Sequence, residues 1–433
     1  MKPLPHLGPT AVGKERRAGH DGLATSRRRD MPPLTEATRS AHHRALMQAA
    51  ARAALALTGR SREIEAQRWL PQDIAEALAE AGLYRLLTPS ELGGHEAAPS
   101  SYYLVIEQLA RADAAAAWCC FISCTASVLS AYLPAEAAAE LFSAPRLKAA
   151  GVFAPRGRAL PAEQDGVRGL RVSGRWAWGS GARNADLITA GCLLIGDDGK
   201  PVLGGDGAAR VLSVVLKRTQ VQLLDNWDAF GLCGTGSGEF EVRDAFVPLA
   251  HSASLFDGPR LQTPLYRFPV FGLLALSIAA VTTGIARQAL DHFIEQASAS
   301  VPQASSKPLA SRATVQAAVA QAEAQLQSAR CYLLASVEAA WLVAQDASEP
   351  AALLPLDARR DLRLAASHAV QISAALVSRL YTLAGGAAVF ADSPLQRALR
   401  DVQVATQHMM VNDATFELSG RLLLGQPSQT QML

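Results

Sequence analysis

The sequence predicts an α+β protein, mainly α, in which a helical domain comes first, a β domain follows and a helical bundle ends the chain. Apolar residues recur at helical spacing over residues 34–150, alternate as in strands over residues 152–247, and return to helical spacing over residues 269–424. A doubly wound sheet would alternate strands and helices throughout the chain, so this order argues against one.

The chain divides into four predicted parts. The first is a disordered leader, because Gly, Pro, Arg and Ser dominate it with little periodicity, and Met31 offers a second start. The four parts are residues 1–32 (leader), 33–150 (N-terminal α-helical domain), 151–262 (central β domain) and 263–433 (C-terminal four-helix bundle).

The local patterns support each part. Residues 64–83 repeat apolar positions at helical steps and end at Gly82, and residues 100–133 predict one long apolar helix. Strands are expected where residues alternate, as in 170–176 and 239–242. The long Ala-rich segments that follow, broken at residues 297–311, 346–356 and 384–393, are typical of a four-helix bundle.

The composition limits the partners. The 41 basic and 39 acidic residues leave a net charge of only +2, which disfavours binding to nucleic acid or anionic lipid. The longest apolar stretch, residues 271–286, is shorter than the ~20 residues of a spanning helix, so a buried helix is expected. No apolar segment follows the N-terminal arginines, so no signal peptide is predicted.

The cysteines and histidines predict no metal site. The six cysteines lack paired CxxC spacing and the histidines are scattered. Buried free thiols in a reducing compartment are the favoured interpretation, and the expected location is the cytoplasm.

Two glycine-rich segments of the β domain could meet a ligand. Residues 231–238 contain a G-x-G-x-G string, but a strand follows where a nucleotide-binding fold needs a helix, so a β connection is preferred. The hydroxyls of Thr235 and Ser237 would still suit a planar polar ligand. Residues 174–181 place two tryptophans beside Ser180, although composition alone favours tryptophans that fill a β core.

A third candidate is His408, in the polar cluster of residues 400–408 near the C-terminus. An imidazole there could act as a base that titrates near neutral pH. A helix cap or an interface residue explains the same pattern equally well, and the residues alone do not decide between these hypotheses.

Taken in order, these segments resemble the acyl-CoA dehydrogenase superfamily over residues 35–425. The resemblance is closest to its flavin-dependent monooxygenase branch, the oxygenase components of two-component hydroxylases. The matching segments are residues 82–94, 109–118, 153–159, 176–181, 226–237, 246–248, 393–397, 400–401 and 407–408. The resemblance implies an N-terminal helical domain, a central β-barrel domain and a C-terminal four-helix bundle.

The same alignment separates the two activities of the superfamily. Dehydrogenases commonly carry a catalytic glutamate shortly after an Arg-Asp pair, and aligning Arg400 and Asp401 on that pair places Met409 at the glutamate. The Met409 side chain is a thioether, which cannot remove a substrate proton, so dehydrogenation by this route lacks its base. The monooxygenase branch has a Gln-His pair here, matched by Gln407 and His408, which favours a functional His408.

The resemblance also implies the site residues. Ser180 falls on the hydroxyl that contacts flavin N5, and Trp178 flanks the isoalloxazine. The implied cofactor-binding residues are Phe153, Trp178, Ser180, Gly181, Thr235, Gly236, Ser237 and Gln407. The implied substrate-binding residues are Trp118, Trp227 and His408, and the implied catalytic residues are His408 and Ser180.

The implied reaction is a monooxygenation. A separate NAD(P)H-dependent reductase would supply reduced flavin, which would react with O2 to give a C4a-hydroperoxide that oxidises a small aromatic or natural-product substrate. Ser180 would hold the N5–H, and His408 would accept or return a substrate proton. FMN is favoured, with FADH2 as an alternative, because residues 302–307 lack the arginine that pairs with the FAD pyrophosphate. A homotetramer is also implied.

Two alternatives stay open at this point. One is an acyl-CoA dehydrogenase or oxidase that uses FAD and a different base, for which Glu417 is the nearest downstream carboxylate. The other is a scaffold that kept the fold without catalysis.

Overall fold

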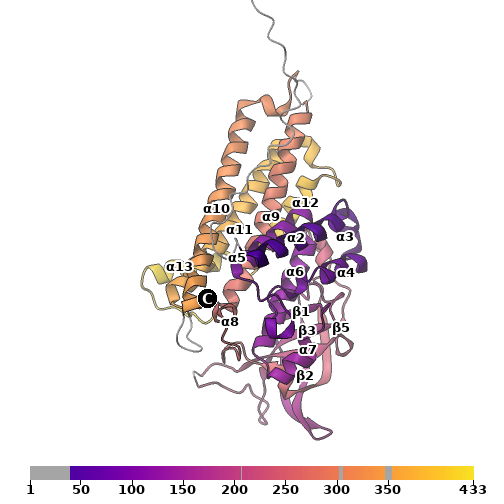
Figure 1. Cartoon of the computed structure of the whole chain (residues 1–433), viewed down its shortest axis with the longest axis vertical. Helices are drawn as coiled ribbons and strands as arrows, with labels where there is room; N and C mark the ends of the chain where they lie inside the picture. The colour runs from indigo at the N-terminus through magenta and orange to yellow at the C-terminus, as the bar shows by residue number, and fades with distance from the viewer. Residues whose placement is uncertain (1–39, 206, 302–305, 347–353) are drawn as a thin grey trace, which may run out of the picture.

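The computed structural model describes residues 40–205, 207–301, 306–346 and 354–433. The predicted leader, residues 1–32, lies outside them. The described chain forms a helical N-terminal part, a sheet and a long helical bundle, with the sheet at one end of the molecule and the bundle at the other (Figure 1). The predicted α+β class and its order of elements are confirmed.

The first domain contains more breaks than the sequence predicted. Asp113 is extended (φ −155°), and its carboxylate caps the second of two helices by accepting from the Ala116 N–H. The prediction of one helix over residues 100–133 is therefore wrong. Residues 64–83 also split, because Arg68 adopts a left-handed conformation and Pro71 precedes the next helix. The helices are α2 (Ala41–Leu57), α3 (Ser61–Gln67), α4 (Gln72–Glu80), α5 (Pro99–Ala112), α6 (Ala114–Ser127) and α7 (Ala135–Phe142).

The β domain is one seven-stranded sheet in the order β5-β6-β2-β1-β3-β4-β7. Its edge strands have two residues each and do not pair with one another, so the sheet stays open where a barrel was expected. Strands β1 and β3 pair in parallel, and the other pairs are antiparallel. The strands are β1 (Ala149–Gln164), β2 (Val167–Trp176), β3 (Leu187–Leu194), β4 (Val211–Lys217), β5 (Gln222–Leu223), β6 (Phe240–Pro248) and β7 (Ser252–Ala253).

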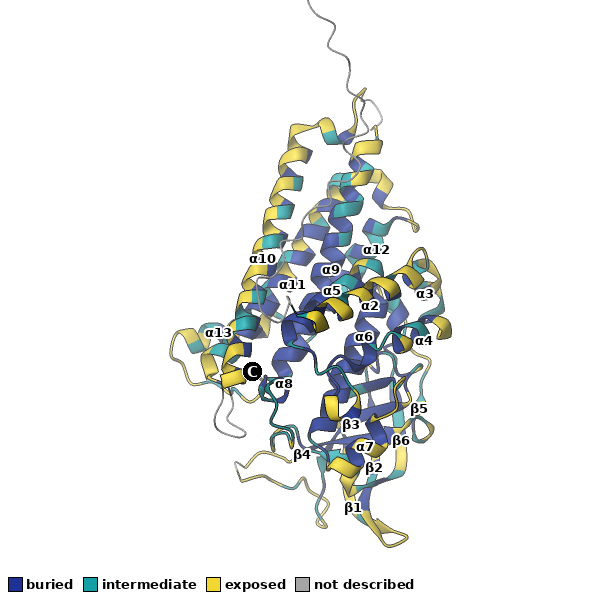
Figure 2. Cartoon of the chain, in the orientation of Figure 1, coloured by how far each residue is buried: buried dark blue, intermediate teal, exposed yellow. Residues whose placement is uncertain are grey.

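The C-terminal bundle is built around one apolar helix, α9, which packs on α5, α6, α11 and α12. Helix α9 and residues 114–131 are long and apolar enough to span a membrane, but 94% and 100% of those windows are buried inside the protein (Figure 2). They are core helices of this fold. The helices are α8 (Pro264–Arg267), α9 (Val270–Ala299), α10 (Ala313–Asp346), α11 (Leu356–Ala384), α12 (Pro394–Thr406) and α13 (Asp413–Leu423).

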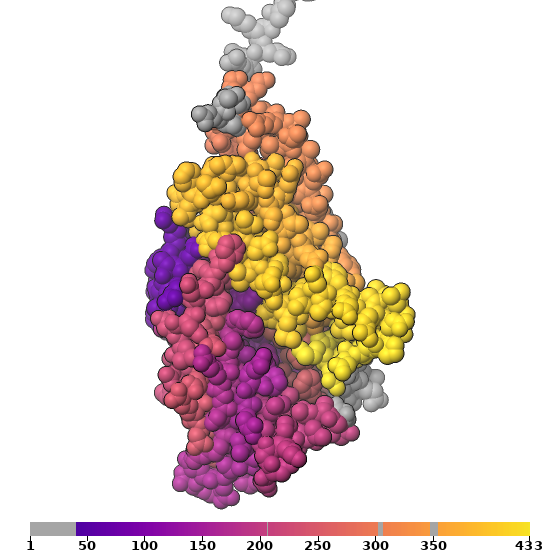
Figure 3. Space-filling view, turned by 180° about the vertical axis from the view of Figure 1, so that it is seen from behind, coloured from indigo at the N-terminus to yellow at the C-terminus, as the bar shows by residue number. Residues whose placement is uncertain are grey.

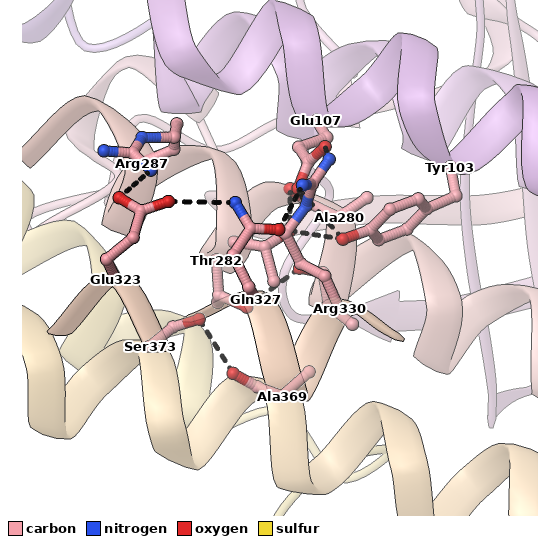
Figure 4. A network of polar contacts seen from close by, with 12 residues as sticks. Tyr103, Glu107, Ala280, Thr282, Arg287, Glu323, Gln327, Arg330, Ala369 and Ser373 are labelled. Carbon is pink, nitrogen blue, oxygen red and sulfur yellow. Dashed lines mark hydrogen bonds and ion pairs between the residues drawn. The ribbon is translucent and has the colours of Figure 1, made fainter. Parts of the chain in front are cut away.

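A buried network of charges ties α5 and α10 together (Figure 4). The Arg330 guanidinium donates to both carboxylate oxygens of Glu107 at 2.7 Å, and the Tyr103 hydroxyl also donates to Glu107. Nearby, Arg287 of α9 binds Glu323 of α10. Each charge has a partner on another helix, so the network fixes how these helices align.

The C-terminal segments lie where the bundle meets the β domain, as the view from behind shows (Figure 3). This position matters because α12 and the residues after it carry His408. All six cysteines are free, and four of them are buried, as predicted; the prediction of burial is wrong for Cys331, which is exposed, and holds only in part for the half-buried Cys233.

Candidate active site

Three hydroxyl groups from two loops form a chain of hydrogen bonds, here called the hydroxyl relay. The indole N–H of Trp118 donates to the Ser180 Oγ at 3.2 Å, and this oxygen lies 2.6 Å from the Ser237 Oγ. The Ser237 Oγ lies 2.6 Å from the Thr235 Oγ1, which donates to the Leu232 carbonyl at 2.7 Å. The relay therefore joins α6, the turn after β2 and the loop before β6.

Local backbone geometry brings Ser180 to this position. Trp178 is left-handed (φ +64°), an uncommon conformation for a bulky residue. The next residue, Gly179, has no room for a side chain, because an added Cβ would lie 2.9 Å from the Phe240 ring. The N–H groups of Gly179 and Gly181 donate to the carbonyls of Gly238 and Thr235, both at 2.9 Å. These bonds hold the two loops together.

The loop before β6 is also attached to α12. Gly231 packs so closely that an added Cβ would lie 2.3 Å from the Arg400 backbone. The Leu232 N–H donates to the Asp401 carboxylate at 2.6 Å. Burial raises the pKa of Asp401 to about 7, an effect that the hydrogen bond from Leu232 partly offsets and the nearby Asp113 strengthens. Sequence comparison matched Asp401 to a motif but gave it no role.

His408 lies just after α12, beside Trp118, with the two rings 6.1 Å apart and inclined at 60°. Its Nδ1 accepts a hydrogen bond from the Met410 N–H at 3.2 Å. Burial lowers its pKa to about 4, and the positive charge of Arg363 contributes. The imidazole is therefore neutral at pH 7, with its proton on Nε2, so it presents a donor where the sequence predicted a base titrating near neutral pH.

Arg363 of α11 was missed by the sequence analysis. It is buried, and it donates to the Met410 carbonyl at 3.1 Å and to the Thr415 Oγ1 at 3.3 Å. It therefore supports the turn that carries His408. The one available indication was that Arg363 is a charged residue on the apolar face of a helix rich in Ala and Leu. This pattern does not indicate that its partner is Met410, in a distant part of the sequence.

Within the part of the chain that the structure describes, the side chains of the remaining predicted residues form no hydrogen bond to the relay. Trp178 is 72% exposed, and Phe153 of β1 is half-buried and packs against the core. The Trp227 indole N–H donates to the Cys233 carbonyl. Gln407 is exposed and donates to the neighbouring Thr406 hydroxyl.

Gly181 and Gly236 are both left-handed, at φ +73° and +57°. At Gly236, an added Cβ would lie 3.2 Å from the Arg68 carbonyl oxygen, so the conformation favours glycine and the space for a side chain is tight. These two glycines shape the loops on either side of the relay.

The two positions considered for a dehydrogenase base, Met409 and Glu417, are both exposed. Met409 is exposed, and the Glu417 carboxylate lies on the exposed face of α13, 3.9 Å from Arg421 of the same helix. Within the described part of the chain, the hydrogen bonds of the relay involve indole, hydroxyl and carbonyl groups and no carboxylate.

Comparison with known proteins agrees with this arrangement. Residues 40–140 match the acyl-CoA dehydrogenase N-terminal domain, and residues 276–413 match its C-terminal domain. The indole-3-acetate monooxygenase of Pseudomonas putida is 32% identical over 365 residues, which cover 84% of this chain and 89% of that protein. The oxygenase component of the FADH(2)-dependent resorcinol hydroxylase from Rhizobium sp. is 27% identical and covers 84% of this chain and 90% of that protein.

Solved structures show the same fold. The 3-HSA hydroxylase from Rhodococcus sp. RHA1 superposes with a TM-score of 0.79 at 26% identity, over 90% of this chain and 99% of that one. The matching family domains, the sequence relatives and the shared architecture all indicate the same family. The chain therefore belongs to the acyl-CoA dehydrogenase family and, within it, to the flavin-dependent monooxygenases that serve as oxygenase components.

Proposed function

We propose that this enzyme oxygenates a small aromatic substrate, using reduced flavin that a separate NAD(P)H-dependent reductase supplies. The observation that carries the proposal is the grouping of Ser180, Trp118 and His408 in one hydrogen-bonded and aromatic cluster. The cluster offers a hydroxyl, an indole and a neutral imidazole, which suit substrate positioning rather than removal of a carbon-bound proton.

The residues fit a flavin ring. Trp178 offers a flat, exposed aromatic face, and Ser180 follows two residues later with a hydroxyl oxygen. When bound, reduced flavin supplies the activation of O2. FMN is the proposed form, with FADH2 as the alternative, because the lack of an arginine in residues 302–307 disfavours the FAD pyrophosphate.

The protein's own residues would position the substrate and keep water away. The Nε2–H of His408 is available to donate to a hydroxyl or carboxylate oxygen of the substrate. Trp118 would form the apolar wall, backed by the fully buried Phe121, whose ring packs edge to face on it at 4.7 Å.

An aromatic substrate follows from this wall and from the relatives. The relative from Pseudomonas putida acts on indole-3-acetate, and the one from Rhizobium sp. acts on resorcinol. We propose a substrate of this class, with a ring for the aromatic wall and an oxygen for His408.

We also propose a homotetramer located in the cytoplasm. The bundle and the segment before α12 expose large apolar side chains, among them Leu342 and Phe390, which association would cover. The unpaired buried thiols fit a reducing compartment.

The test is anaerobic mixing of the protein with reduced FMN and indole-3-acetate, followed by addition of O2. We expect an oxygenated product in preference to free hydrogen peroxide. His408→Ala should lower product yield by ~10²-fold or more, with the lost product appearing as peroxide. His292→Ala, on α9, is the matched control. Product yield equal in His408→Ala and wild type would contradict the assigned role.

The dehydrogenase hypothesis needs a base, and the candidate that the sequence offers for it is Glu417. Glu417 is exposed and paired with Arg421. An acyl-CoA thioester should therefore leave the absorbance of protein loaded with oxidised FAD unchanged, and bleaching of that absorbance would overturn the monooxygenase proposal.

A further inference from the structure

We propose that Thr235 and Ser237 fix the direction of the Ser180 hydroxyl, so that the site accepts a hydrogen bond from the flavin and thereby prefers reduced over oxidised flavin. The inference rests on the proposed function, because it assumes that Ser180 faces flavin N5. It assigns Thr235 and Ser237 as positioning residues that act through Ser180.

The direction of each hydrogen bond follows from counting hydrogens. The relay has four hydrogen bonds and three hydroxyl groups. At one end, the Trp118 indole can only donate; at the other, the Leu232 carbonyl can only accept. Each hydroxyl supplies one hydrogen, so one arrangement alone satisfies all four bonds.

In that arrangement the hydrogens all point the same way. The Thr235 hydroxyl donates its hydrogen to the Leu232 carbonyl. Ser237 must therefore donate to Thr235, and Ser180 must donate to Ser237. Ser180 also accepts from Trp118. What remains on the Ser180 oxygen is one lone pair and no hydrogen.

This polarity is protected from solvent. Ser180, Thr235 and Ser237 are 4%, 1% and 6% exposed, so bulk water has little access to exchange partners with them. The backbone bonds from Gly181 to Thr235 and from Gly179 to Gly238 hold the two loops in register. Turning the Ser180 hydrogen away from Ser237 would break their hydrogen bond and leave the buried Ser237 oxygen without its donor, which is unfavourable.

The lone pair distinguishes the two redox states of flavin. N5 of reduced flavin carries a hydrogen and donates to an acceptor, whereas N5 of oxidised flavin carries a lone pair and would face the Ser180 lone pair. The relay should therefore strengthen binding of reduced flavin and weaken binding of oxidised flavin. This preference suits an enzyme that takes up reduced flavin from another protein.

The experiment compares dissociation constants of oxidised FMN and anaerobically reduced FMN, together with the midpoint potential of FMN at saturating protein. In Ser237→Ala the Ser180 hydrogen is released and can turn toward N5. We expect the preference for reduced FMN to fall about tenfold, the effect of one neutral hydrogen bond. The potential of bound FMN should then fall by about 30 mV, since a tenfold change corresponds to that shift in a two-electron couple.

Two substitutions at Thr235 refine the test. Thr235→Val removes the hydroxyl that receives the Ser237 hydrogen and should reproduce the shift, whereas Thr235→Ser keeps the hydroxyl and should retain the wild-type preference. Ser373→Ala is the matched control, because that buried hydroxyl donates to the Ala369 carbonyl within its own helix, α11, away from the relay (Figure 4). Thermal unfolding of each variant identifies any loss of folding.

The outcomes separate the inference from the proposed function. A lowered preference in Ser237→Ala and Thr235→Val, with Thr235→Ser and Ser373→Ala unchanged, supports the inference. If folded Ser237→Ala and Thr235→Val bind FMN with the wild-type ratio, the relay has no such effect, although the enzyme remains a flavin monooxygenase. If wild-type protein binds neither form of FMN nor of FAD, the proposed site itself is wrong.

Discussion

The imidazole of His408 shows how burial settles a protonation state that the sequence context leaves open. The sequence located both His408 and Ser180, because each lies within a recognisable motif. It could not assign their hydrogens, because those depend on distant partners: Trp118 and Ser180 are 62 residues apart, and Arg363 contacts the turn of His408 from another helix. Burial makes His408 a donor rather than the expected base.

The lowered pKa of His408 predicts a pH dependence of stability. Between its ordinary value of 6.5 and about 4, the unfolded chain binds a proton that the folded chain does not. The contribution of His408 to the free energy of unfolding is therefore fully present above pH 6.5. It is lost as the pH falls toward 4, and the loss amounts to up to about 3 kcal/mol. His408→Gln should lack this decrease when the free energy of unfolding is measured in urea at pH 7.5 and pH 5. Equal decreases in variant and wild type would contradict it.

Among the elements, the contact between α12 and the loop before β6 links the two halves of the site. Asp401 and His408 lie two turns apart along α12 and the turn that ends it, and Asp401 holds Leu232, at the end of the relay. The sequence predicted the order of helices and strands because periodicity is a local property. It missed the break at Asp113, although an aspartate directly before an apolar segment is a helix N-cap signal, because the apolar residues before and after it suit one continuous helix.

Asp401 gives a prediction at this scale. Its folded pKa of about 7 lies above the ordinary 3.8, so the folded state retains the proton and stability decreases as the pH rises from 3.8 to 7. Asp401→Asn stays neutral and keeps an oxygen for Leu232, so at pH 8 it should be more stable than wild type, by about 1 to 4 kcal/mol. Asp401→Ala removes the charge and also the acceptor, so it should be less stable than Asp401→Asn by about 1 to 3 kcal/mol. Denaturant titration checks both, and a destabilised Asp401→Asn at pH 8 would refute the assignment.

At the scale of the whole molecule, the bundle combines a nearly uniform apolar core with one buried ionic contact between α5 and α10. The sequence predicted the bundle from segment lengths. It could not predict the pairing of Glu107 with Arg330, which are 223 residues apart, because several helices carry residues of either charge. The open sheet was also unpredictable, since short edge strands leave little pattern.

Removing one partner of this pair should be costly. Glu107→Gln leaves a buried guanidinium without its counter-charge and should lower the free energy of unfolding by about 3–5 kcal/mol. The double variant Glu107→Leu with Arg330→Met should recover most of that loss. Glu241→Gln, in the solvent-exposed pair with Arg243, should leave the free energy of unfolding nearly unchanged and is the control. A double variant as unstable as the single one would show that the charges themselves are required.

The left-handed backbone at Trp178 has a practical consequence. Of the six tryptophans, all within the described residues, Trp178 alone is exposed, whereas Trp118 and Trp176 are buried. A soluble quencher such as acrylamide should therefore reduce mainly the fluorescence emission of Trp178. A ligand that stacks on this indole would shield it, so the unlabelled protein carries a built-in optical sensor for occupancy, readable without turnover or oxygen.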